Sequence, residues 1–146
     1  MCLLIFISSM IYIKKNIINE IINTIGKNKI ELGGILGLKD NCIVSFYFDK
    51  KLIYKKQYIP NVIKINKIIK KWYKEDIMFI GFIHSHANGY NKPSKDDYIY
   101  AKKLIDTNKF LEYLIFPIVT IIDNEIKIDY YKFTDDFEKI VVEEIE

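Results

Sequence analysis

The sequence contains no arginine, and all 22 of its basic residues are lysine. Arginine is the side chain best suited to phosphate and guanine, because its planar fork donates two parallel hydrogen bonds. Its absence, together with a net charge of only +3, argues against a protein that binds nucleic acid. No apolar run approaches the roughly 20 residues that cross a bilayer, so we expect no membrane partner.

Cysteine is almost as scarce, because the chain has only Cys2 and Cys42. Two isolated cysteines without a C-x-x-C pair exclude a disulfide scaffold and a cysteine-rich zinc site. They favour a cytoplasmic protein kept in a reducing compartment. The apolar residues 1–13 lack the positive start and the small-residue cleavage site of a signal peptide. We expect them to form a buried first strand, with Met10 as an alternative start that would leave residues 1–9 outside the native protein.

What the sequence does contain predicts one domain, 1–146. Its 146 residues are 50% hydrophobic and 28% charged, which suits a single globular core without repeats or linkers. Apolar residues recur with strand and helix periods in turn. Strands are expected at 11–13, 33–37, 42–48, 52–58, 78–84, 114–122 and 126–133, with turns at 49–51 and 123–124.

Three helices are expected between these strands. The first covers 16–25 and is ended by Gly26. The second is opened by Pro60 and carries an apolar stripe of Val62, Ile65, Ile69 and Trp72. The third is opened by Ser94 and has Tyr98, Ala101 and Ile105 on one face. Residues 135–146 are expected to form a short acidic helix or tail. The pattern predicts a mixed α/β fold of the α+β type, in which about three helices flank a largely antiparallel, curved sheet.

The only two histidines of the chain are His84 and His86, at the end of an expected strand. Side chains at i and i+2 of a strand share a face, so two imidazoles would stand side by side. A catalytic zinc ion takes three protein ligands and keeps one open position. Asp97 supplies a third ligand if Ser94 caps the next helix, because Asp97 then lies in the first helical turn beside the end of that strand.

Hydrolysis also requires a group that takes a proton from the attacking water. Glu31 is the best candidate for this general base. It precedes the Gly33–Gly34 segment, where the lack of side chains allows a close approach to a metal.

Taken together, these residues resemble the JAMM/MPN (JAB domain) family of zinc metalloproteases, in a compact prokaryotic-type form. The segment 31–37 resembles the glutamate motif of that family. His84-Ser85-His86, followed after seven residues by Ser94 and then Asp97, resembles its H-x-H-x7-S-x-x-D signature. The resemblance covers nearly the whole chain and implies the MPN/JAB, cytidine deaminase-like architecture.

The resemblance also implies roles for single residues. His84, His86 and Asp97 would bind one Zn²⁺ per chain. Glu31 would act as general base, and Ser94 would stabilise the oxyanion of the tetrahedral intermediate. The implied substrate is a ubiquitin-like modifier or a sulfur-carrier protein, cut at an amide bond at its C-terminus. A modifier-activating enzyme of the same pathway is a further expected partner.

The sequence departs from the family at Ala87, where many members have proline. A proline there shapes the loop without binding metal, so we expect this change to affect loop rigidity and to spare zinc binding. The short stretch between Asp97 and Leu114 has no histidine or cysteine for a second zinc.

Simpler interpretations stand beside the catalytic one. Alone, the histidines could be a polar pair, Ser94 and Asp97 a helix cap, and Glu31 a solvated carboxylate. The scattered lysine pairs are typical of solvated faces, although they could also hold an acidic partner. Two other functions stay open: a non-catalytic MPN scaffold, and a JAB-like protein that acts in a DNA-related context.

Overall fold

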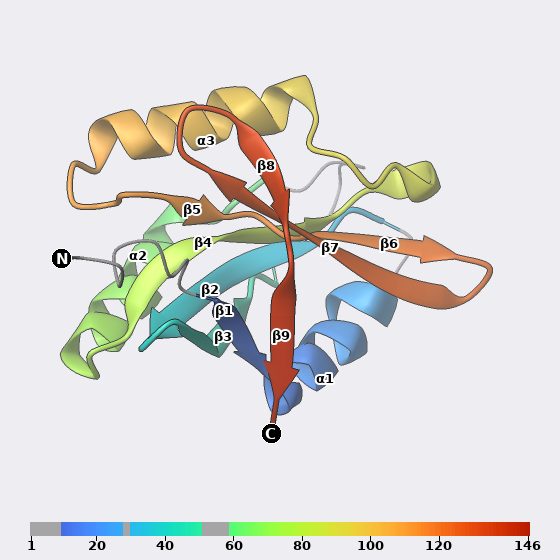
Figure 1. Cartoon of the computed structure of the whole chain (residues 1–146), viewed down its shortest axis with the longest axis horizontal. Coiled ribbons are helices and arrows are strands. Elements are labelled where there is room, and N and C mark those ends of the chain that lie inside the picture. The colour runs from blue at the N-terminus through green and yellow to red at the C-terminus, as the bar shows by residue number, and fades with distance from the viewer. Residues whose placement is uncertain (1–9, 28–29, 51–58) are drawn as a thin grey trace, which may run out of the picture.

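The computed structural model describes residues 10–27, 30–50 and 59–146. Within these residues, nine strands form one curved sheet, in which eight follow the order β5-β7-β6-β4-β2-β3-β1-β9 and β8 pairs with β7 (Figure 1). The strands are β1 (Ile11–Lys14), β2 (Gly33–Lys39), β3 (Cys42–Phe48), β4 (Met78–Ser85), β5 (Leu114–Ile115), β6 (Ile118–Ile122), β7 (Glu125–Phe133), β8 (Phe137–Ile140) and β9 (Val142–Ile145). Most neighbours are antiparallel, and β1–β3, β1–β9 and β4–β6 are parallel. The predicted fold class is therefore confirmed.

The helices are α1 (Lys15–Asn23), α2 (Val62–Lys74) and α3 (Lys95–Thr107), with short 3₁₀ turns η2 (Ile25–Lys27) and η3 (Ala87–Gly89). They cover two different faces of the sheet. Ile35 and Leu36 are neighbours in β2 and belong to separate hydrophobic cores, because successive strand residues point to opposite faces. The core of Leu36 includes α1, and the core of Ile35 includes α2 and α3.

The segment 33–37 is glycine-rich because the sheet is tightly packed there. A Cβ atom on Gly34 would lie 2.2 Å from the carbonyl oxygen of Tyr47 on β3. At Gly34 the close approach expected from the sequence is therefore made by a neighbouring strand. It fixes the end of β2 against β3 on one side and β4 on the other.

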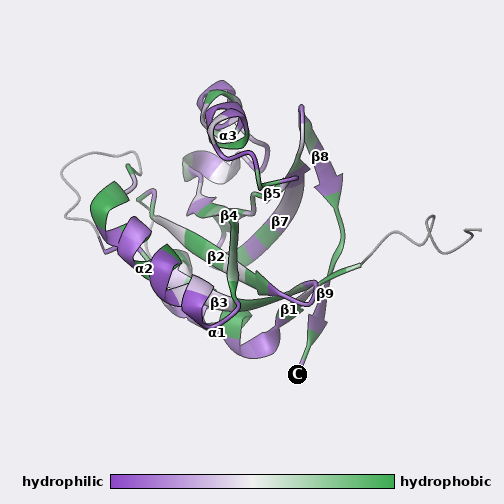
Figure 2. Ribbon diagram, turned by 90° about the vertical axis from the view of Figure 1, so that its left-hand side faces the viewer, coloured by the Kyte–Doolittle hydropathy of each residue, from purple (hydrophilic) through white to green (hydrophobic). Residues whose placement is uncertain are grey.

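Several boundaries differ from the sequence expectation. The first helix ends at Asn23, and Gly26 lies buried in η2. Val62 is 59% exposed instead of belonging to the buried stripe, because it is the first residue of α2 and the buried residues of this helix begin at Ile65. Ile65 and Trp72 are buried as expected, and Figure 2 shows α2 as alternating hydrophobic and hydrophilic residues.

Expectations near the C-terminus are partly wrong. The strand expected at 114–122 is divided into β5 and β6 around Pro117, which has no N–H for the ladder. Asp123 and Asn124 form the predicted turn with φ angles of 50° and 64°. The acidic helix or tail expected at 135–146 is wrong, because these residues form β8 and β9.

The physical reason is strand pairing. β8 pairs with β7, and β9 lies parallel to β1 at the edge of the sheet. The strand expected at 52–58 lies outside the described residues. So do Lys51, the last residue of the expected turn at 49–51, and residues 1–9. None of the helices in the described part of the chain combines the length and apolar character needed to span a membrane.

Candidate metal centre

His84 and His86 lie at the C-terminal end of β4 and just beyond it. Their Nε2 atoms are 2.8 Å apart, so both rings occupy one face, as strand alternation predicts. The side chains are only 9% and 8% exposed. The ring of Phe116 packs edge-on against His84, with centroids 5.2 Å apart, and limits the freedom of that imidazole.

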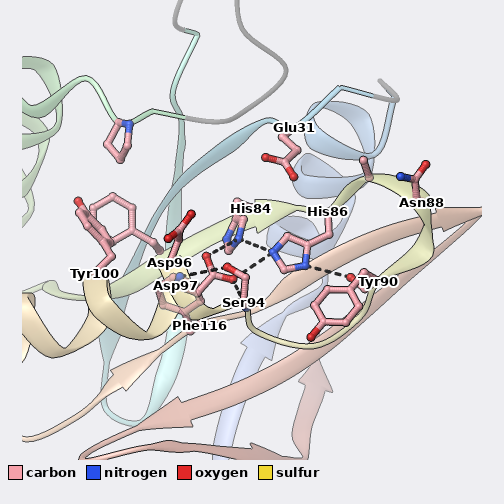
Figure 3. A pocket seen from close by; sticks show the side chains of 13 residues that line it. Glu31, His84, His86, Asn88, Tyr90, Ser94, Asp96, Asp97, Tyr100 and Phe116 are labelled. Carbon is pink, nitrogen blue, oxygen red and sulfur yellow. Dashed lines mark hydrogen bonds and ion pairs between the residues drawn. The ribbon is translucent and has the colours of Figure 1, made fainter.

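Asp97 reaches the two imidazoles from the first turn of α3 (Figure 3). Its Oδ1 lies 3.1 Å from Nε2 of His84, and its Oδ2 lies 3.1 Å from Nε2 of His86. Among the described residues, these three form a group whose possible ligand atoms all lie within 4.8 Å of one another. The structure thus brings together the three ligands that the sequence predicts.

Ser94 is the N-cap of α3 and holds Asp97 in this orientation. The backbone N–H of Asp97 donates to Ser94 Oγ at 3.1 Å, and the backbone N–H of Ser94 donates to Asp97 Oδ2 at 2.8 Å. This reciprocal capping box satisfies two otherwise free helix donors. The capping box therefore also orients the Asp97 carboxylate toward the two histidines.

The hydrogen bonds of His86 determine which of its nitrogens is free. Its Nδ1 lies 3.0 Å from the carbonyl oxygen of Tyr90, which only accepts hydrogen bonds, so Nδ1 carries a proton. The neutral imidazole then has a lone pair on Nε2, facing the Asp97 carboxylate and the second imidazole. Two acceptors at this distance repel each other unless a proton or a metal cation lies between them.

A zinc ion fits this set of donors. Tetrahedral ligands at the usual zinc distances of about 2.0–2.1 Å are about 3.3 Å apart, close to the 2.8–3.1 Å between the Nε2 atoms and the carboxylate oxygens. Two imidazoles and one carboxylate are also a ligand set of catalytic zinc sites. The residues therefore suit a divalent cation such as zinc.

The protonation of the site follows from the same contacts. Burial opposes the charged form of Asp97, but hydrogen bonds from His84, His86 and Ser94 outweigh it and hold the pKa of Asp97 well below its usual range. Burial also opposes the imidazolium of His86, yet its hydrogen bond to Asp97 and the charge of Asp97 raise the pKa of His86. The pocket favours a positive charge next to an ionised carboxylate.

Glu31 lines the same pocket from a position two residues before β2. Gly33 pairs with His84 in the antiparallel ladder, and extending this register by two residues places Glu31 opposite His86. The ladder continues at Ser85, whose backbone N–H donates to the carbonyl oxygen of Leu32 at 2.9 Å. In Figure 3 the Glu31 carboxylate points toward the two imidazoles, on the side away from Asp97. Glu31 and Ser94 both line the cavity around the histidines.

Comparison with known proteins relates this geometry to a fold. No family model and no curated protein matches the sequence. A JAB1/MPN domain protein from Archaeoglobus fulgidus matches in structure with a TM-score of 0.56 and 16% identity, over 94% of this chain and 100% of that one. A structure of the JAMM metalloprotease-like zinc site in the proteasome and signalosome matches with a TM-score of 0.53 and 15% identity, over 94% and 100%.

The chain has the MPN/JAB fold. A solution structure of a protein from Desulfitobacterium hafniense is also similar, with a TM-score of 0.72 and 17% identity over 94% of both chains. At these identities the likeness concerns the fold. The metal centre is therefore supported by the geometry of this chain's own residues.

Within this MPN/JAB fold, the loop 87–93 joins His86 to Ser94 and is held by contacts that the sequence did not reveal. Asn88 has a φ of 58° in η3. The Tyr90 ring stacks on His86 at 5.7 Å and 17°. The hydroxyl of Tyr131, on β7, donates to the Asn91 carbonyl oxygen at 2.7 Å. Proximity to the histidines could have indicated Tyr90, but no local signal marks Tyr131, which is 40 residues away from its partner.

Proposed function

We propose that the chain is a zinc-dependent peptidase or isopeptidase that hydrolyses an amide bond at the C-terminus of a ubiquitin-like modifier or a sulfur-carrier protein. The observation that carries the proposal is the convergence of His84, His86 and Asp97 in a pocket that Glu31 also lines. Three protein ligands leave a fourth position open, as a catalytic zinc site requires. The substrate class is what the resemblance of the segment 31–37 and of the H-x-H-x7-S-x-x-D pattern to the JAMM/MPN family implies.

In this proposal His84, His86 and Asp97 hold the metal, which when bound polarises the amide carbonyl and lowers the pKa of water in the site. Glu31 takes a proton from the attacking water and passes it to the nitrogen of the leaving amine. His86 keeps its Nε2 available because its Nδ1–H is engaged by Tyr90. These side chains line one cavity, and groups that the fold holds in advance reduce the cost of reorganisation during the reaction.

Ser94 is suited to stabilise the oxyanion that develops on the amide oxygen. Its Oγ accepts the Asp97 N–H, so the hydroxyl hydrogen remains free to donate into the pocket. A donor of this kind acts more strongly in a partly buried site than in water. The scarcity of cysteine supports a cytoplasmic location, and the resemblance to the JAMM/MPN family implies a modifier-activating enzyme as a pathway partner.

Cleavage of modifier fusions by the zinc-loaded protein tests the proposal. The panel contains ubiquitin-like and sulfur-carrier proteins with a reporter after the C-terminal glycine. We expect wild type to release the reporter, and Glu31→Gln to be slower by about 10²-fold or more, because it loses general-base catalysis. Glu20→Gln, on the exposed side of α1, is the matched control and should cleave like wild type.

Two results would contradict the proposal in different ways. Equal cleavage by wild type and Glu31→Gln would remove Glu31 from the role of base. Zinc-loaded wild type that cuts none of the fusions would favour the alternative function, a non-catalytic MPN scaffold that binds protein partners.

A further inference from the structure

The cavity around the metal centre extends beyond the residues needed to hold an ion. It has a volume of about 650 Å³ and is also lined by Phe82, Tyr100 and Phe116. Phe82 lies two residues before His84 on β4 and therefore on the same face. Its ring meets the Tyr100 ring edge-on at 5.2 Å. These aromatic rings give the cavity an apolar wall beside the proposed ligands.

Asp96 adds a carboxylate to this wall. It lines the same cavity and is exposed, and it forms no ion pair with any described residue. Figure 3 shows Asp96 between Tyr100 and Asp97, on the side of Asp97 away from His86. An acidic residue in the first turn of α3 is favourable for the helix dipole. That effect does not require the carboxylate to line a cavity.

Among the described residues that line the cavity, negative charges outnumber positive ones. Its described lining contains three carboxylates, those of Glu31, Asp96 and Asp97, and no lysine. A divalent cation at the histidines would be offset by Asp97 and Glu31. The negative charge of Asp96 would remain in a cavity that Phe82 and Tyr100 also line.

We infer that this part of the cavity is a subsite for a cationic group on an apolar stem, such as a lysine or arginine side chain next to the scissile bond. The inference rests on the proposed metal centre and names a feature of its substrate. The stem would pack against Phe82 and Tyr100, and long basic side chains bury their methylenes in this way. The charged end would be attracted by Asp96 and by the aromatic ring of Tyr100.

Other side chains suit the subsite less well. An anionic group would face Asp96 and Glu31, and like charges at close range repel. A purely apolar group would pack against the aromatic wall, but it would partly desolvate the Asp96 carboxylate without replacing the hydrogen bonds to water that this carboxylate loses.

Three linear hydroxamates test the inference without requiring catalysis. They are 6-aminohexanohydroxamic acid, hexanohydroxamic acid and adipic monohydroxamic acid, which share a metal-chelating end and carry a cationic, neutral or anionic terminus. Their dissociation constants are measured by calorimetry on zinc-loaded wild type, Asp96→Asn and Asp106→Asn. Asp106 lies on the same helix with a side chain 61% exposed and paired with Lys102, so its variant makes the same change in net charge away from the cavity.

We expect wild type and Asp106→Asn to bind the cationic compound about tenfold more tightly than the anionic one, as expected for a partly exposed charge pair. In Asp96→Asn this ratio should fall below about threefold. Equal binding of the three compounds by wild type, or an unchanged ratio in Asp96→Asn, would overturn the inference.

The outcome is separable from that of the proposed function. If wild type prefers the cationic compound but cleaves no modifier fusion, the peptidase proposal is rejected and the subsite is supported. If wild type cleaves the fusions and binds the three hydroxamates equally, the peptidase proposal is supported and the subsite is rejected.

Discussion

At the scale of single residues, Ser94 has two structural effects at once. Its side chain accepts the Asp97 N–H, and its backbone N–H holds the Asp97 carboxylate. The first contact stabilises the start of α3, and the second keeps Asp97 directed at His84 and His86. Capping and metal binding are therefore compatible interpretations of the same S-x-x-D sequence.

Replacing Ser94 with alanine should lower the free energy of unfolding by about 1 kcal/mol, the usual cost of losing an N-cap side chain. Urea denaturation of the metal-free protein measures the change. Ser94→Thr keeps a hydroxyl and should recover most of the loss. Asn61→Ala, which removes the N-cap acceptor of α2, should cause a loss of similar size. An Ser94→Ala variant as stable as wild type would show that the capping bond contributes nothing.

At the scale of elements, the site depends on how the loop 87–93 is anchored between β4 and α3. The hydroxyl of Tyr131 donates to the Asn91 carbonyl oxygen, and the Tyr131 ring is 7% exposed and packs edge-on against Phe137 of β8. A rigid side chain on β7 thus fixes the segment that connects His86 to Ser94. This anchoring matters here because Ala87 follows the second histidine, so no proline stiffens the start of the loop.

Removing only that hydroxyl, in Tyr131→Phe, should weaken zinc binding by about tenfold, the lower range for residues that orient metal ligands through others. Competition with a chromophoric chelator measures the affinity. Tyr130→Phe is the matched control, because Tyr130 precedes Tyr131 on β7 and points to the opposite face of the strand. Identical zinc affinities in the three proteins would refute the role of this contact.

The elements that carry the site were the most predictable from sequence. β4 is an apolar run that includes His84 near its end and leads to His86, and α3 begins with a capping box. Both signals are local, so they needed no knowledge of the fold. In contrast, β8 and β9 contain charged residues, and their sequence predicts a helix or tail. β8 is a strand because it forms a hairpin with β7, which ends at Phe133, just before β8 begins at Phe137. β9 is a strand because it pairs with β1, which is far away in sequence, so no local pattern encodes this partner.

The same distinction applies to the candidate site. His84, His86, Asp97, Glu31 and Ser94 could be proposed because their spacing fits a metal centre and resembles a family motif. The contribution of Tyr131 depends on a contact between residues far apart in sequence. The aromatic wall formed by Phe82 and Tyr100 likewise depends on how α3 packs against β4. Sequence periodicity can indicate that each residue faces the core, but it cannot predict that the two rings touch.

At the scale of the whole molecule, the metal centre is where three separate elements meet. β4 supplies the first histidine and leads directly to the second, α3 supplies Asp97, and the start of β2 places Glu31 opposite them. The antiparallel ladder between β2 and β4 pairs Gly33 with His84. The antiparallel ladder thereby sets the position of Glu31 relative to the histidines.

Metal analysis of the purified protein tests the central claim most directly. Wild type, dialysed without added metal, should contain one zinc ion per chain by mass spectrometry, and Asp97→Ala should lose it because only two ligands remain. Asp96→Ala is the control, since its carboxylate belongs to the neighbouring wall of the cavity, and it should retain the zinc. A wild type without zinc, or an Asp97→Ala variant that binds zinc as tightly as wild type, would contradict the account.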